Sequence, residues 1–184
     1  QYQIGEYYLS RKEWEKAANA YRYIYRHYPS FELADDSLFR TGQVYLFKKD
    51  FQKAAVSFKK LMMSYPKSPY LPDARFLSGD SFFEMNDYQR ALREYERFMK
   101  DYPGSALVPK ALYRSGEILS SHLNEEKKGE FFLKRIIKEY PDDPLRFDAS
   151  LKMGRRKIKR LMRRSDTSKM RPARRTRRPQ PQDF

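Results

Sequence analysis

The feature that most constrains this chain is an internal repeat of about 37 residues. A Tyr-Pro pair recurs with spacings of 37, 37 and 38 residues, at Tyr28-Pro29, Tyr65-Pro66, Tyr102-Pro103 and Tyr140-Pro141. Five of the seven glycines follow the same register: Gly5, Gly42, Gly79, Gly116 and Gly154. Self-similarity at a fixed period of this length is typical of proteins built from stacked supersecondary units. We therefore expect a repeat protein.

Each unit has the residue spacing of two helices. In the second unit, small and apolar residues recur at helical spacing in two runs, Leu38, Gly42 and Tyr45, then Phe51, Ala54, Phe58, Leu61 and Tyr65. The polar turn 48–50 separates the runs, and Asp50 is placed to cap the second helix, as Asp87 is one unit later. Each second helix should end at Tyr-Pro, because the residue before a proline is disfavoured in the helical region.

A single helix pair cannot bury its apolar stripe, so the pairs must stack. The sequence predicts an all-α fold, a right-handed superhelical solenoid of antiparallel helix pairs with a C-terminal capping helix. The glycine and alanine columns should let the two helices of a pair approach closely. The expected helices are 1–10, 13–28, 33–48, 51–65, 70–85, 88–101, 107–122, 126–139 and 145–163.

The order of residues within a unit resembles the tetratricopeptide repeat. The segment GQVYLFKKDFQKAAVSFKKLMMSYP, from Gly42 to Pro66, carries its pattern of glycine, aromatic, alanine, aromatic and proline. The usual period is about 34 residues, and the additional residues here follow Tyr-Pro, as in YPKSPYLPDA and YPGSALVPKA. Such longer units resemble the subtype found in bacterial envelope proteins, including outer-membrane assembly lipoproteins of the BamD type and Tol-Pal associated proteins of the CpoB (YbgF) type. The fourth unit departs from the pattern, with one residue inserted in NEEKKG, Asn124 to Gly129.

Charge is distributed unevenly along the chain. The net charge is +15, and the segment from Lys152 to Phe184 holds 14 basic residues against 2 acidic ones, a net charge of +12. We divide the chain into four repeats over 1–143 (the first one truncated), a basic amphipathic capping helix over 144–164 and a disordered Pro/Arg-rich tail over 165–184. The basic residues of the capping helix and the tail are predicted to contact an anionic surface: Arg155, Arg156, Lys159, Arg160, Arg163, Arg164, Arg174, Arg175, Arg177 and Arg178.

Catalysis has little support in the sequence. The chain has no cysteine, hence no thiol nucleophile or thiolate metal site. His27 and His122 have no convergent carboxylates around them. The pairs Asp35-Asp36 and Asp142-Asp143 fall at helix starts, where carboxylates complement the helix dipole. We predict that the protein is not an enzyme and binds no cofactor, metal or small-molecule substrate.

The tetratricopeptide resemblance implies a partner-binding groove lined by the first helix of each unit. Carried onto this chain, the groove positions are Asp36, Phe39, Gln43, Leu46, Asp73, Phe76, Asp80, Phe83, Lys110, Tyr113 and Glu117. Aromatic and acidic side chains together would suit a peptide with apolar anchors and some positive charge. We expect polar substitutions of Phe76 and Phe83 to abolish partner binding without unfolding the protein.

The resemblance implies an interaction scaffold in a bacterial cell-envelope complex, in the periplasm or at the periphery of the outer membrane. A protein partner would bind in the groove, and the basic C-terminus would contact an anionic membrane or an acidic protein. The alternative is a nucleic-acid-associated adaptor that uses the basic helix and tail. A signal peptide or lipid anchor encoded upstream would favour the first hypothesis.

Overall fold

A computed structural model describes residues 1–154, in which the regular secondary structure is entirely helical. The helices are α1 (Tyr2–Ser10), α2 (Trp14–His27), α3 (Ala34–Phe47), α4 (Phe51–Ser64), α5 (Leu71–Glu84), α6 (Tyr88–Asp101), α7 (Val108–Glu117), the π-helix η1 (Ile118–His122) and α8 (Glu126–Glu139). The chain is helical again over 145–154. The predicted all-α repeat fold is therefore confirmed. The remainder of the expected capping helix and the tail lie outside the described residues.

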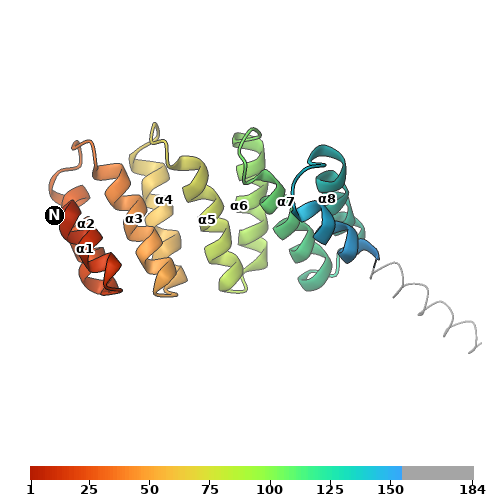
Figure 1. The fold of residues 1–184 in the computed structure, drawn as a ribbon, viewed down its shortest axis with the longest axis horizontal. Helices are drawn as coiled ribbons and strands as arrows, with labels where there is room; N and C mark the ends of the chain where they lie inside the picture. Colours follow the sequence, from red (N-terminus) through yellow and green to blue (C-terminus); the bar gives the residue numbers. More distant parts are fainter. Residues whose placement is uncertain (155–184) are drawn as a thin grey trace, which may run out of the picture.

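The helices stand side by side in chain order, from α1 at one end to α8 and the 145–154 helix at the other (Figure 1). Each helix packs mainly against its neighbours in the sequence, as expected of a solenoid. We call α1, α3, α5, α7 and the 145–154 helix the first helices, and α2, α4, α6 and α8 the second helices. Buried side chains form two clusters, and Leu77 of α5 packs against both.

The glycine column is explained by ring contacts within each helix pair. A Cβ atom added at Gly42 would lie 2.5 Å from the buried ring of Phe58, and one added at Gly5 would lie 2.6 Å from that of Tyr21. The same clash would occur in the third unit, between Gly79 and Tyr95, at 2.8 Å. A missing side chain on the first helix thus makes room for an aromatic ring on the second.

The turns between paired helices repeat as regularly as the glycines. Each turn contains one residue in the left-handed region, with φ between 56° and 62°: Lys12, Lys49, Asn86 and Asn124. The first three lie seven residues after the framed glycine, but Asn124 lies eight residues after Gly116. From Asn124 to Gly129 the spacing is the same five residues that separate Lys49 from Ala54. The extra residue therefore lies in the π-helix 118–122, and its predicted position within 124–129 is wrong.

Capping follows the sequence at Asp50 and Asp87. Asp50 accepts a hydrogen bond from the backbone N–H of Lys53 (3.2 Å), and Asp87 accepts one from that of Arg90 (3.1 Å). These side chains satisfy amide groups that the helix itself leaves unpaired. α2 has no such bond from its N-cap residue, Glu13. Among the described helices, none has the length and apolar character needed to cross a membrane.

Candidate partner-binding surface

The predicted groove residues come from α3, α5 and α7 at matching repeat positions, but they do not all reach the surface. Phe76 is 1% exposed and packs against Tyr95 and Phe98, with both ring-centroid distances 5.6 Å. Phe39 is 7% exposed and stacks on Tyr70 at 4.9 Å. The expectation that these two rings line an open groove is wrong, because both pack against aromatic rings of neighbouring segments. A polar residue at Phe76 would disrupt the core.

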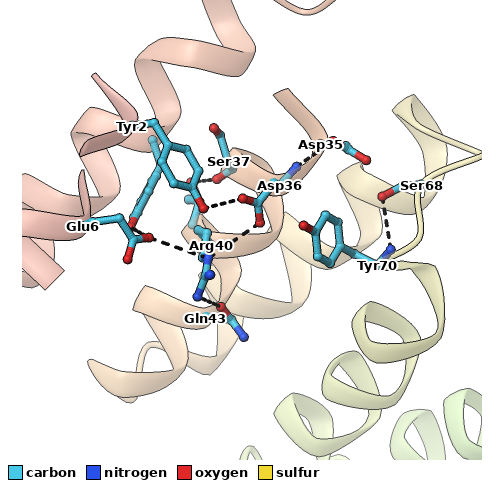
Figure 2. Close-up of polar contacts among 11 residues, drawn as sticks. Tyr2, Glu6, Asp35, Asp36, Ser37, Arg40, Gln43, Ser68 and Tyr70 are labelled. Carbon is cyan, nitrogen blue, oxygen red and sulfur yellow. Dashed lines mark hydrogen bonds and ion pairs between the residues drawn. The ribbon is translucent and has the colours of Figure 1, made fainter. Parts of the chain in front are cut away.

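Asp36 is also buried, and it belongs to a polar network between α1 and α3. The hydroxyl of Tyr2 donates to Asp36, and the Arg40 guanidinium lies 3.6 Å from the same carboxylate. Arg40 also lies 3.7 Å from Glu6, so it bridges carboxylates of two first helices. Figure 2 shows this arrangement, with Arg40 between Glu6 and Asp36. Burial, followed by the hydrogen bond to Asp36, raises the pKa of Tyr2 to about 12.

The Glu6–Arg40 pair is one member of a ladder that runs along the first helices. In each case the carboxylate directly follows a framed glycine, and the base lies two residues before the next one. Asp80 and Arg114 are 3.9 Å apart, and Glu117 and Lys152 are 2.8 Å apart. In the second unit the two positions hold the uncharged residues Gln43 and Leu77. The acidic groove residues Asp80 and Glu117 are thus neutralised by the next repeat.

Two core tyrosines of the second helices form hydrogen bonds with carboxylates of this ladder. The hydroxyls of Tyr21 and Tyr95 donate to Glu6 and Asp80, each at 2.5 Å. Where the core ring is Phe58, the residue after the glycine is the amide Gln43 and not a carboxylate. Burial is the largest cause that raises the pKa of the Tyr95 hydroxyl, and the neighbouring Asp80 carboxylate adds to it. Sequence reasoning missed this pairing, although the match of tyrosine with acid and phenylalanine with amide was its signal.

The accessible part of the predicted set is therefore smaller. Asp73 and Lys110 are exposed, while Gln43, Leu46, Phe83, Tyr113 and Glu117 are half-buried. The ammonium group of Lys152 lies over the Tyr113 ring at 4.8 Å. We call Leu46, Phe83 and Tyr113 the first-helix strip. It offers apolar side chains from three successive first helices, and the charges around it are largely paired.

An aromatic cluster that the sequence did not predict adjoins Phe83. The guanidinium of Arg114 lies 4.4 Å from the Phe83 ring centroid, and Tyr88 packs edge-on against the same ring at 5.8 Å. His122, the last residue of the π-helix, stacks on Tyr88 at 3.9 Å. The π-helix accounts for the one additional residue that gives the fourth unit its spacing of 38 residues. Because π-helical turns often occur at functional sites, this spacing was the sequence signal for the cluster.

Two classes of site residue remain to be placed. The predicted anionic-surface residues, from Arg155 to Arg178, lie outside the described residues. His27 stacks on Tyr23 at 4.2 Å on an exposed helix end, and its Nδ1 lies 2.9 Å from the Tyr23 carbonyl oxygen. Over residues 1–154, no group of three or more His, Cys, Asp or Glu side chains is arranged to hold a metal ion.

Comparison with known families fits this repeat geometry. Residues 1–30 match the tetratricopeptide repeat family, and residues 32–168 match the YfiO family, described as outer membrane lipoprotein. The chain belongs to the YfiO family. The expected resemblance to tetratricopeptide proteins of the BamD type is thereby confirmed. Both matches support a protein–protein interaction scaffold, and no curated protein matches the chain.

Solved structures agree with the YfiO assignment at the level of the fold. A crystal structure of MamA has a TM-score of 0.62 and 20% identity, with 75% of each chain covered. A tetratricopeptide repeat protein from Parabacteroides merdae ATCC 43184 has a TM-score of 0.65 and 15% identity, over 77% of this chain and 53% of that protein. At such identities the likeness concerns the solenoid fold alone.

Proposed function

We propose that this YfiO-family chain is a non-enzymatic scaffold of a bacterial outer-membrane complex, and that the first-helix strip binds a protein partner. The family description, outer membrane lipoprotein, supports the cellular location. The observation that carries the binding role is the strip itself. Leu46, Phe83 and Tyr113 lie on helices that also carry the ion-pair ladder, and their apolar side chains remain half-exposed. An apolar partner could therefore contact them.

The ion-pair ladder makes this face better suited to an apolar partner segment than to the positively charged peptide expected from the sequence. Asp80 and Glu117 already have basic partners within the chain, so a cationic peptide would have to displace Arg114 or Lys152. An extended segment with apolar side chains spaced to reach successive repeats would gain more, because buried apolar anchors dominate binding energy. The exposed Asp73 and Lys110 would then contribute polar contacts at the rim of the strip.

Site-specific photo-crosslinking in the native cells tests this proposal. A photoreactive amino acid would replace Gln43, Asp73 or Lys110 beside the strip, and Glu96 or Lys134 on second helices as exposed controls. We expect one common partner from the three strip positions, in the envelope fraction. We expect Tyr113→Ser to reduce that crosslink, with helical content unchanged.

Two outcomes would overturn separate parts of the proposal. Equal crosslinking from Glu96 and Lys134 would reject the first-helix strip as the binding surface. Recovery of the intact protein only in the cytosolic fraction would reject the outer-membrane role. Both readouts come from the same cells, so the two failures are distinguishable.

A further inference from the structure

A groove separate from the first-helix strip is lined mainly by second helices. A groove of about 570 Å³ runs between α4 and α6, and α5 contributes Arg75, Ser78 and Phe82 to its lining. The α4 wall, from Gln52 to Met63, follows helical spacing of three and four residues. None of the predicted groove residues lies in it. The first-helix strip and this α4–α6 groove are therefore separate surfaces.

The α4–α6 groove exposes apolar side chains that the repeat architecture does not require. Val56 is 57% exposed and Met63 is 73% exposed. At the equivalent positions, 37 residues before and after, α2 carries Asn19 and Arg26, and α6 carries Arg93 and Lys100. The same two surface positions are thus polar on both neighbouring second helices. On α8 the two positions hold the exposed Phe131 and Lys138, so among the described second helices only α4 is apolar at both.

The equivalent groove one repeat earlier is filled by the protein itself. Tyr25 and Tyr45 are 9% and 5% exposed there, and the ammonium groups of Lys60 and Lys53 lie over their rings at 4.6 and 5.4 Å. The α4–α6 groove has Met62 and Phe82 at these two positions, and both are only half-buried. The space that tyrosines occupy between α2 and α4 is open between α4 and α6.

The rim of the α4–α6 groove carries an excess of positive charge. Its lining includes five basic side chains but a single carboxylate, that of Glu94. Glu94 is already shared, at 3.3 Å from Arg75 and 3.5 Å from Arg97. Lys59 of α4 and Arg93 of α6 both line the groove, and neither makes an ion pair with another described residue. Outside the lining, Arg90 also pairs with Asp87 at 2.6 Å and Arg75 with Asp101 at 3.7 Å, so within residues 1–154 Lys59 and Arg93 are the lining cations without an ion pair.

We propose that the α4–α6 groove binds an acidic amphipathic helix of a partner protein. Its apolar side chains would cover Val56, Met63 and Phe82, and its carboxylates would pair with Lys59 and Arg93. The α4 wall is about 16 Å long at ~1.5 Å rise per residue, which matches about three turns of a bound helix. A flat membrane surface would reach only the crests of α4 and α6 and would leave Phe82 uncovered. This inference does not depend on the first-helix strip.

The methionine methyl groups provide a local readout for the test. The full chain, labelled with ¹³C at its methionine methyls, would be titrated with a 14-residue helical peptide that carries leucine on one face and glutamate on the other. We expect the signals of Met62 and Met63 to shift, while those of Met99 and Met153 stay unchanged. A scrambled peptide of the same composition should bind at least tenfold more weakly, because it lacks the apolar face.

The chain itself supplies a matched variant. The double substitution V56N/M63R installs side chains of the kinds that α2 carries at the same positions, so the fold should tolerate it. We expect at least a tenfold loss of affinity for the labelled peptide by fluorescence anisotropy. Phe131→Arg, at the equivalent of Val56 on α8 and 59% exposed, should leave the affinity unchanged. Arg93→Glu should weaken binding and reduce its dependence on salt.

Three results would overturn the proposal. The first is an absence of Met62 and Met63 shifts with the helical peptide. The second is equal affinity of V56N/M63R and the wild-type chain. The third is a shift of these signals by phosphatidylglycerol vesicles without any shift by the peptide, which would assign the surface to a membrane instead.

Discussion

Replacing Gly42 by alanine tests the packing rule on which the solenoid depends. The added Cβ would lie 2.5, 2.8 and 2.9 Å from three carbon atoms of the Phe58 ring, where ordinary contacts are 3.4–4 Å. The ring cannot withdraw, because Phe58 is fully buried and packs against Phe39 at 5.9 Å. α3 and α4 would therefore have to separate, which would open the core between them.

The expected change in the free energy of unfolding is the sum of two opposing contributions. Overpacking a filled core costs about 1–3 kcal/mol, and three ring atoms closer than 3 Å place Gly42→Ala at the upper end of this range. Alanine gains about 1 kcal/mol over glycine through helix propensity. We expect the free energy of unfolding to fall by about 2 kcal/mol, the remainder of these two contributions.

Urea unfolding followed by circular dichroism at 222 nm measures this difference. Gly104→Ala is the matched control, since no atom lies within 4 Å of its added Cβ, and we expect a change within about 0.5 kcal/mol. In a Phe58→Leu background, Gly42→Ala should cost less, because the ring that it strikes is gone. A Gly42→Ala protein as stable as the wild type would refute the reasoning.

Three further predictions concern the turns, the tyrosines and the last described helix. Lys49 has a φ of 62°, so Lys49→Gly should stabilise the protein by about 0.5–1 kcal/mol in the same urea assay, as expected for a left-handed position. The pKa of Tyr2 is raised from 10.0 to about 12, so the folded state holds this proton more tightly than the unfolded state. The contribution of Tyr2 to stability should therefore be constant below pH 10 and be lost between pH 10 and 12. Tyr2→Phe should make the fall shallower in urea titrations at each pH. Lys152→Met removes the 2.8 Å contact to Glu117 and should accelerate amide hydrogen exchange over residues 145–154, while exchange in α3 stays unchanged.

The helices could be predicted closely because their determinants are local. Asp50 and Asp87 cap helices where the sequence places them, and each second helix ends at the tyrosine that precedes a proline. Proline and capping residues act on backbone groups within a few positions, so no knowledge of the tertiary contacts was needed. The position of the inserted residue was predicted wrongly, because one additional residue can be accommodated in either the helix or the turn.

The candidate surface was predictable only in part. A repeat frame assigns Phe76 and Phe83 to first helices, yet one ring is buried and the other half-buried. Which way a ring turns depends on the space left by the neighbouring repeat, and a single unit does not contain that information. The pairing of Asp80 with Arg114 joins residues 34 positions apart and likewise needs two stacked repeats.

The sequence by itself determined the period, the helix pairs and the close approach of glycine to a buried ring, because the same residues recur at fixed spacing. Only the tertiary structure decided which charges are neutralised and which apolar side chains stay accessible. Burial is a property of stacked neighbours: Tyr25 is buried between α2 and α4, whereas Met62, at the equivalent position in the next repeat, is only half-buried. Partner binding should therefore be tested separately at two surfaces, the first-helix strip and the α4–α6 groove.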